Sequence, residues 1–130
     1  MNAARCLGFS GFAVSMPFKK EVLKYVDLLS DEVKSIGASN TIVNLDGELK
    51  AYNTDYNAAK EVLSKESRPL YILGNGGYAA AVKKAAKDLK LQYELITRKN
   101  WNDIPIIRNS VVYNCTPVKN IETHDSCRYI

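Results

Sequence analysis

The chain has 130 residues, a formal net charge of +4 and 46% hydrophobic residues, which is typical of one globular domain or two very small ones. We expect no signal peptide, because the first residues lead into mixed sequence, and no membrane span, because no apolar run approaches about 20 residues. Its basic residues form no stripe interleaved with aromatics, which argues against nucleic-acid binding. Cys6, Cys115 and Cys127 lack paired spacing and His124 is the single histidine, so we expect no metal site and a cytoplasmic protein with free thiols.

Apolar periodicity organises the first forty residues. Residues 11–15 are typical of a short strand, and apolar residues at helical spacing then predict a helix that begins at Pro17. Ser30 is expected to start a second, short helix that ends near Gly37. The apolar residues of the first helix are Phe18, Val22, Val26 and Leu29.

A hairpin is predicted next. Two strands, 41–45 and 48–52, flank the pair Asp46-Gly47, which is a strong signal for a two-residue turn. Counting outward from that turn brings polar side chains together at the open end of the hairpin. Diagonal neighbours there are only about 7–8 Å apart, so their side chains can touch one small ligand. These residues are Asn40, Asn53 and Asp55.

Thr54 is expected to cap a helix whose apolar stripe contains Ala58, Ala59, Val62 and Leu63. The polar residues 64–69 then indicate a linker. We therefore expect two parts, 1–65 and 66–130.

The second part is predicted to be a parallel, right-handed strand–helix–strand unit. A strand at 70–73 runs into the glycine-rich turn Gly74 to Ala79, a helix reaches Leu91, and strands follow at 93–97 and 110–114. Such a turn directs backbone N–H groups and the positive end of a helix at one point, where a pyrophosphate can bind. The alternative is a turn with a purely geometric role. The lysines on one flank of the helix are interpreted as a solvated face: Lys83, Lys84, Lys87 and Lys90.

Together these segments resemble the shikimate dehydrogenase family, from about Gly11 to Pro117. Four motifs agree in order and spacing, and two weaker matches follow at residues 97–99 and 114–117. The four are Val-Ser-Met-Pro-Phe-Lys at 14–19, Gly-Ala-Ser-Asn-Thr-Ile at 37–42, Tyr-Asn-Thr-Asp at 52–55 and Gly-Asn-Gly-Gly at 74–77.

The resemblance implies an α/β fold, with a partial substrate-binding α/β domain followed by a partial Rossmann-type nucleotide-binding domain. It implies an NADP-dependent oxidoreductase that reduces 3-dehydroshikimate to shikimate in aromatic amino-acid biosynthesis. Lys19 and Asp55 would be catalytic, and Ser15, Lys19, Asn40 and Asp55 would contact the substrate. The implied cofactor-binding residues are Gly74, Asn75, Gly76, Gly77, Tyr78, Thr97, Arg98 and Lys99.

These residue types suit the chemistry. Hydride addition to a ketone develops negative charge on oxygen, which a nearby ammonium stabilises and protonates. Basic residues after the second nucleotide-binding strand accept the 2′-phosphate of NADP, whereas an acidic residue there binds the 2′-hydroxyl of NAD. Arg98 and Lys99 therefore favour NADP, and Glu94, the acidic candidate, is expected inside the strand.

The chain also departs from the family. Members are longer at both ends, so we expect a truncated chain. Ser15 replaces a threonine, and Asn75 and Tyr78 replace alanines. The form Ser-Met-Pro-Phe-Lys resembles a shikimate-dehydrogenase-like subgroup. Two alternatives stay open: activity on quinate or another hydroxy acid, and a non-catalytic nucleotide- or metabolite-binding remnant. Because an incomplete parallel sheet exposes an edge strand, a homo-oligomer is also expected.

Overall fold

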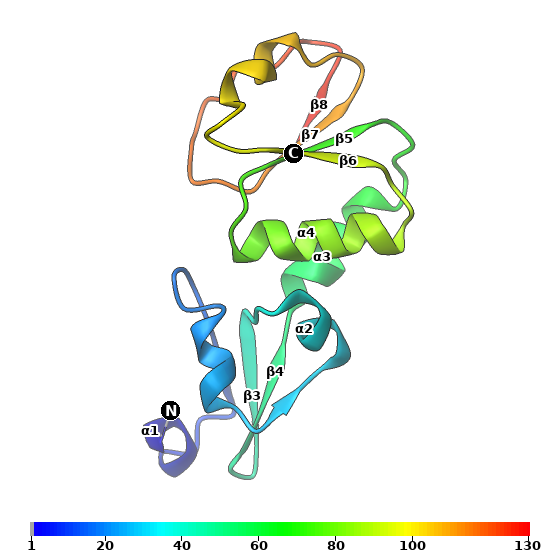
Figure 1. The fold of residues 1–130 in the computed structure, drawn as a ribbon. Helices are drawn as coiled ribbons and strands as arrows, with labels where there is room; N and C mark the ends of the chain where they lie inside the picture. Colours follow the sequence, from blue (N-terminus) through cyan, green and yellow to red (C-terminus); the bar gives the residue numbers. More distant parts are fainter. Residues whose placement is uncertain (1) are drawn as a thin grey trace.

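The computed structural model describes residues 2–130, which build two separate four-stranded sheets (Figure 1). The first sheet has the strand order β1-β3-β4-β2 and is mixed, because β2 pairs in parallel with β4 and the other pairs are antiparallel. Its strands are β1 (Gly11–Ala13), β2 (Leu28–Leu29), β3 (Thr41–Leu45) and β4 (Glu48–Tyr52).

The predicted hairpin is confirmed in its register. Leu45 pairs with Glu48 and Thr41 with Tyr52, as counting outward from the turn requires. Asp46 and Gly47 both have positive φ, at 51° and 96°. That conformation matches the right-handed twist of the flanking strands, so a turn of two residues closes the hairpin without splaying it.

The predicted helix from Pro17 to Leu29 is wrong. In its place are turns, the short 3-10 helix η1 (Glu21–Tyr25) and strand β2. The carbonyl of Lys19 accepts a hydrogen bond of 2.7 Å from the N–H of Ser39, so a contact distant in sequence takes the acceptor that a helix would use. The second short helix is confirmed as α2 (Asp31–Ile36), which ends at Gly37 in the left-handed conformation. A further helix, α1 (Asn2–Cys6), precedes the first strand.

The second sheet is entirely parallel, with the strand order β6-β5-β7-β8, so the predicted α/β class is confirmed. Its strands are β5 (Leu70–Leu73), β6 (Tyr93–Ile96), β7 (Val111–Asn114) and β8 (Arg128–Tyr129). The fourth strand was not expected. Helix α4 (Gly77–Asp88) lies on one face and the 3-10 helix η2 (Trp101–Ile106) on the other, so both faces are covered (Figure 1).

Helix α3 (Thr54–Leu63) joins the two sheets (Figure 1). Its N-cap is Asn53, whose side chain accepts a hydrogen bond from the N–H of Tyr56, so the cap predicted at Thr54 is one residue out. Ala59 and Leu63 are fully buried in one cluster with residues of α4, β5 and β7, whereas Ala58 of the predicted stripe is exposed. Thus α3 begins beside the hairpin and ends in the core of the second sheet.

Among residues 2–130, no helix combines the length and apolar character that a membrane crossing requires.

Candidate active site

An ion pair lies at the open end of the hairpin. Lys19 Nζ is 2.5 Å from Asp55 Oδ2, and the two side chains are only 15% and 21% exposed. Lys19 comes from the turns before η1, while Asp55 is in the first turn of α3. A hydrogen-bonded pair that is largely withdrawn from water holds both side chains in a defined orientation, which acid–base chemistry needs.

Asn40 fixes the carboxylate of this pair. Its amide nitrogen donates to Asp55 Oδ1 and to Thr54 Oγ1, both at 2.9 Å. Its amide oxygen accepts from the N–H of Thr54 and from the hydroxyl of Thr41, again at 2.9 Å. Both oxygens of Asp55 therefore have defined partners. We call Lys19, Asn40 and Asp55 the hairpin-end cluster.

Two buried polar residues hold the backbone beneath the cluster. Ser39 Oγ donates to the carbonyl of Tyr52 at 2.7 Å, and Asn53 Nδ2 donates to the carbonyl of Ala38 at 2.9 Å. Buried polar groups are retained where their hydrogen bonds are made, and these bonds tie both sides of the hairpin together. Asn53 lies at the predicted end of the hairpin, but no role for Asn53 or Ser39 is evident from the sequence.

The glycine-rich turn lies directly against the cluster. A Cβ added at Gly77 would meet Lys19 Cβ at 3.4 Å and Cδ at 3.5 Å, so the start of α4 lies close beside the stem of the lysine. At Gly74, φ is +96° and an added Cβ would lie 2.8 Å from Thr116 Cγ2. Only glycine fits there, because both the backbone conformation and the space exclude a side chain.

A cleft of about 390 Å³, the glycine crevice, opens beside Gly74. Three predicted cofactor residues line it: Gly74, Asn75 and Arg98. Its other lining residues were not predicted as cofactor-binding from the sequence. Thr116 and Pro117 belong to a weak motif match in the sequence. They also follow the carboxyl end of a parallel strand, which is where ligands bind in such sheets, and that position could have predicted them. The missed residues are Trp101, Thr116, Pro117 and Val118.

Other predicted cofactor residues do not line the crevice. The N–H of Thr97 donates to Asn100 Oδ1 at 2.8 Å, within the loop after β6, and Lys99 is exposed in that loop. Gly76 and Gly77 form the start of α4, whose N–H groups carry the positive end of the helix. Tyr78 turns toward Lys19, with Lys19 Nζ 5.8 Å from the centre of its ring.

The remaining candidates from the sequence are Ser15 and Glu94. Ser15 is exposed, and its hydroxyl makes no hydrogen bond within the part of the chain that the structure describes. Glu94 lies inside β6, where it pairs with Tyr71 rather than following the last residue of the strand. Within residues 2–130, no three His, Cys, Asp or Glu side chains gather to hold a metal ion.

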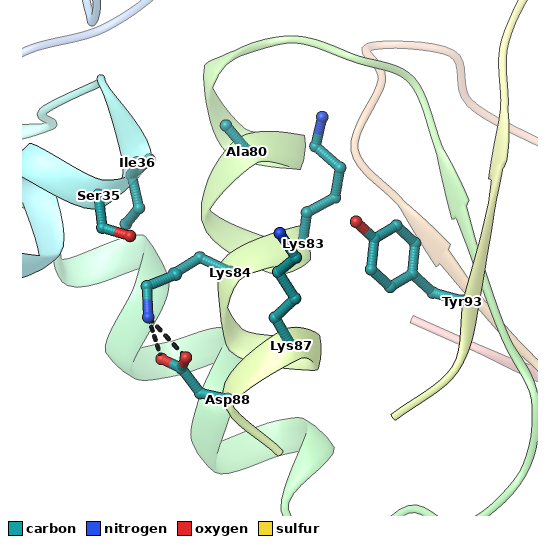
Figure 2. A pocket seen from close by; sticks show the side chains of 8 residues that line it. All are labelled: Ser35, Ile36, Ala80, Lys83, Lys84, Lys87, Asp88 and Tyr93. Atoms are coloured by element: carbon teal, nitrogen blue, oxygen red, sulfur yellow. Dashed lines mark hydrogen bonds and ion pairs between the residues drawn. The ribbon is translucent and has the colours of Figure 1, made fainter. Parts of the chain in front are cut away.

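The lysine flank of α4 borders another cavity, of about 460 Å³, between α2 and α4 (Figure 2). Lys84 pairs with Asp88 at 2.5 Å and thereby lowers the pKa of that carboxyl. Lys83 extends toward the start of the helix, where its ammonium donates to Asn75 Oδ1 at 2.7 Å. Lys87 and Lys90 are exposed, whereas Lys83 and Lys84 are half-buried and make hydrogen bonds at the surface, so this face is solvated but partly paired.

Cys115 directly follows Asn114, the last residue of β7. Burial raises the pKa of its thiol to about 12, with a further contribution from the negative charge of Asp55. The thiol is therefore protonated at neutral pH and is a poor nucleophile.

Comparisons with known proteins show a family to which the chain is similar. Residues 1–42 match the family model of the shikimate dehydrogenase substrate binding domain. The NADP(+) shikimate dehydrogenase of Chlorobaculum tepidum is 46% identical over 90 residues, which are 65% of this chain and 30% of that protein. Its counterpart from Pyrococcus abyssi is 37% identical over 123 residues, 92% of this chain and 40% of that protein.

The resemblance to the shikimate dehydrogenase family is confirmed. The chain spans 30–40% of the length of these two shikimate dehydrogenases. The matched substrate-binding segment contains Lys19 and Asn40, while Asp55 and the glycine-rich turn follow it.

A solved shikimate dehydrogenase shares the fold. The structure of shikimate 5-dehydrogenase from Thermus thermophilus, in complex with NADP(H) and shikimate, superposes with a TM-score of 0.72 at 25% identity. The match covers 87% of this chain and 50% of the Thermus thermophilus chain.

Proposed function

We propose that the chain supplies the catalytic cluster and the cofactor turn of an NADP-dependent oxidoreductase of shikimate dehydrogenase type. Its reaction is the reduction of 3-dehydroshikimate to shikimate, a step of aromatic amino-acid biosynthesis. The observation that carries the proposal is the ion pair of Lys19 and Asp55, which lies directly against the start of α4 at Gly77. That contact brings a proton donor to the element that would hold a dinucleotide.

The residues around the glycine crevice fit a dinucleotide. Gly74 lets the backbone turn where any side chain would collide with Thr116, and α4 directs its free N–H groups at the turn. Gly74, Asn75 and Gly76 would hold the pyrophosphate, and Arg98, exposed at the rim, would meet the 2′-phosphate of NADP. When bound, the nicotinamide supplies a hydride to the carbonyl carbon of the substrate.

The chain's own side chains supply the rest of the chemistry. The Lys19 ammonium donates its proton to the carbonyl oxygen as negative charge develops there, and it recovers a proton from solvent. Asp55 keeps the ammonium in place and can accept a hydrogen bond from a neighbouring substrate hydroxyl. Asn40 orients Asp55, and it would also meet a substrate hydroxyl, as would Ser15.

Steady-state kinetics test this proposal. Purified protein with NADP and shikimate should generate NADPH absorbance, and Lys19→Ala should abolish it. Lys20→Ala, at an exposed neighbouring position, is the matched control and should keep the wild-type rate. Turnover of quinate or another hydroxy acid alone would revise the substrate, and NADP binding without any turnover would support a non-catalytic remnant.

Three further expectations extend the proposal. We propose a division into parts 1–65 and 66–130, which the two separate sheets support. The free thiols of Cys6, Cys115 and Cys127 support a reducing compartment such as the cytoplasm.

The third is a homo-oligomer, because β6 is an outer strand of the parallel sheet. Light scattering during size-exclusion chromatography should then give a mass above one chain, and a stable monomer would contradict the oligomer.

A further inference from the structure

Tyr78 occupies an unusual position between the two parts of the site. It lies in the first turn of α4, immediately after Gly77, yet its ring turns away from the glycine crevice and toward Lys19. Lys19 Nζ is 5.8 Å from the centre of the ring, within the range of about 6 Å over which a cation is attracted to an aromatic face.

The ring of Tyr78 is itself held in place by Tyr113 of β7. The two hydroxyls are 3.0 Å apart, and the rings meet edge to face with centroids 6.1 Å apart and an interplanar angle of 62°. Tyr113 is only 4% exposed, and burial raises the pKa of its phenol, so the hydroxyl stays neutral and needs a partner. Tyr78 provides that partner and is thereby fixed to the second sheet.

Lys19 is thus held on three sides. Gly77 lies beside the stem, where an added Cβ would meet it at 3.4 Å, Asp55 pairs with the ammonium, and the ring of Tyr78 approaches the ammonium from α4. A lysine side chain has four rotatable bonds and loses much conformational freedom when it is ordered, so contacts made before the reaction reduce the entropy lost during it.

We propose that Tyr78 is a positioning residue. Its ring keeps the Lys19 ammonium oriented toward the substrate site. The inference rests on the proposed function, because Lys19 is the proton donor there. It also assigns the first turn of α4 two tasks: its backbone faces the cofactor, and the side chain of its second residue, Tyr78, sets the position of the Lys19 ammonium. Tyr78 reaches Lys19 from the part of the chain that would hold the cofactor.

A pair of double variants separates the ring from the hydroxyl. Tyr78→Phe with Tyr113→Phe removes both hydroxyls together and leaves no buried group without a partner, while it keeps both rings. Tyr78→Leu with Tyr113→Phe removes the ring of residue 78 as well. Comparing the two variants isolates the effect of the ring, and circular dichroism of both checks that they fold.

The direct readout is the NMR signal of the two Cε protons of Lys19, assigned by its loss in Lys19→Arg. In wild type and in the double phenylalanine variant, these protons should be distinct and shifted upfield by the ring. In the leucine variant, they should merge and move to the position of a free lysine. Unchanged Lys19 signals in a folded leucine variant would overturn the proposal.

Kinetics provide the second readout. The leucine variant should lower kcat about fivefold relative to the double phenylalanine variant, with KM for NADP unchanged. A merely structural role would change kcat and KM together, and equal kcat values would overturn the positioning role. If the wild type shows no turnover, the proposed function fails, and the NMR signals alone still decide whether Tyr78 holds Lys19.

Discussion

The hairpin-end cluster and the glycine crevice hold their functional groups in different ways. Lys19, Asn40 and Asp55 bond to one another and are largely withdrawn from water. Around the crevice, the groups that would meet a ligand are backbone N–H groups and Arg98, which is exposed and makes no hydrogen bond within residues 2–130. The cluster is therefore ordered in advance by hydrogen bonds between its own side chains, whereas the crevice offers a ligand backbone N–H groups and an exposed arginine. Substitutions in the cluster should therefore reduce turnover, whereas substitutions in the crevice should reduce cofactor binding.

Asp55→Asn should have the largest effect. It preserves shape but removes the charge that holds Lys19, so we expect kcat to fall about 10³-fold, within the range for loss of acid–base geometry. Steady-state NADPH absorbance measures the change. Asp31→Asn is the matched control, because Asp31 forms only an exposed pair with Lys34. A loss of less than about threefold at Asp55 would contradict a side-chain-ordered cluster.

Cys115 tests the boundary between the two regions. Burial raises the pKa of its thiol from 9.0 to about 12, so the thiolate fraction at pH 8 falls about 10³-fold. Alkylation by iodoacetamide should be slower by at least that factor in folded protein than in denaturant. The rate should rise about tenfold per pH unit, because the reactive form increases as pH approaches the pKa. Mass spectrometry of the Cys115 peptide measures the alkylation rate. Equal rates in folded and denatured protein would contradict the burial of the Cys115 thiol.

Asn53→Ala should destabilise the fold, although Asn53 itself takes no direct part in the proposed chemistry. It removes the N-cap of α3 and the buried hydrogen bond to the carbonyl of Ala38, and we expect a loss of about 2 kcal/mol in the free energy of unfolding. Urea denaturation measures it. Asn57→Ala, at an exposed position on the same helix, should change stability by less than about 0.5 kcal/mol.

Arg98→Gln should have the smallest effect. Loss of one charged contact to the 2′-phosphate should weaken NADP binding about tenfold and leave NAD binding unchanged. Isothermal titration with both nucleotides measures it. Arg108→Gln, also exposed but outside the residues that line the crevice, is the control. Equal losses for NADP and NAD would remove Arg98 from phosphate recognition.

Local signals explain which elements the sequence predicted well. The pair Asp46-Gly47 determines a turn and thereby a register, so the meeting of Asn40 and Asp55 followed from counting alone. Likewise, a buried strand, glycines and a helix appear consecutively at β5 and α4.

Contacts between distant segments explain what the sequence did not predict. The carbonyl of Lys19 accepts a hydrogen bond from the N–H of Ser39, so turns replace the expected helix, and β2 pairs with β4, as in the pair Leu28 and Lys50. The places of Tyr78 and Trp101 depend on how two sheets and η2 pack. No periodicity in the sequence encodes that packing.

Helix α3 has a consequence for the ancestry and engineering of this chain. Its first turn carries the Asp55 carboxylate, while Ala59 and Leu63 are packed in the core of the second sheet. In a chimera whose junction lies within residues 64–69, α3 would pack against α4, β5 and β7 of a homologue. A shift of α3 on that surface would also shift the Asp55 carboxylate. Recombination that preserves activity should therefore inherit α3 and α4 from the same parent.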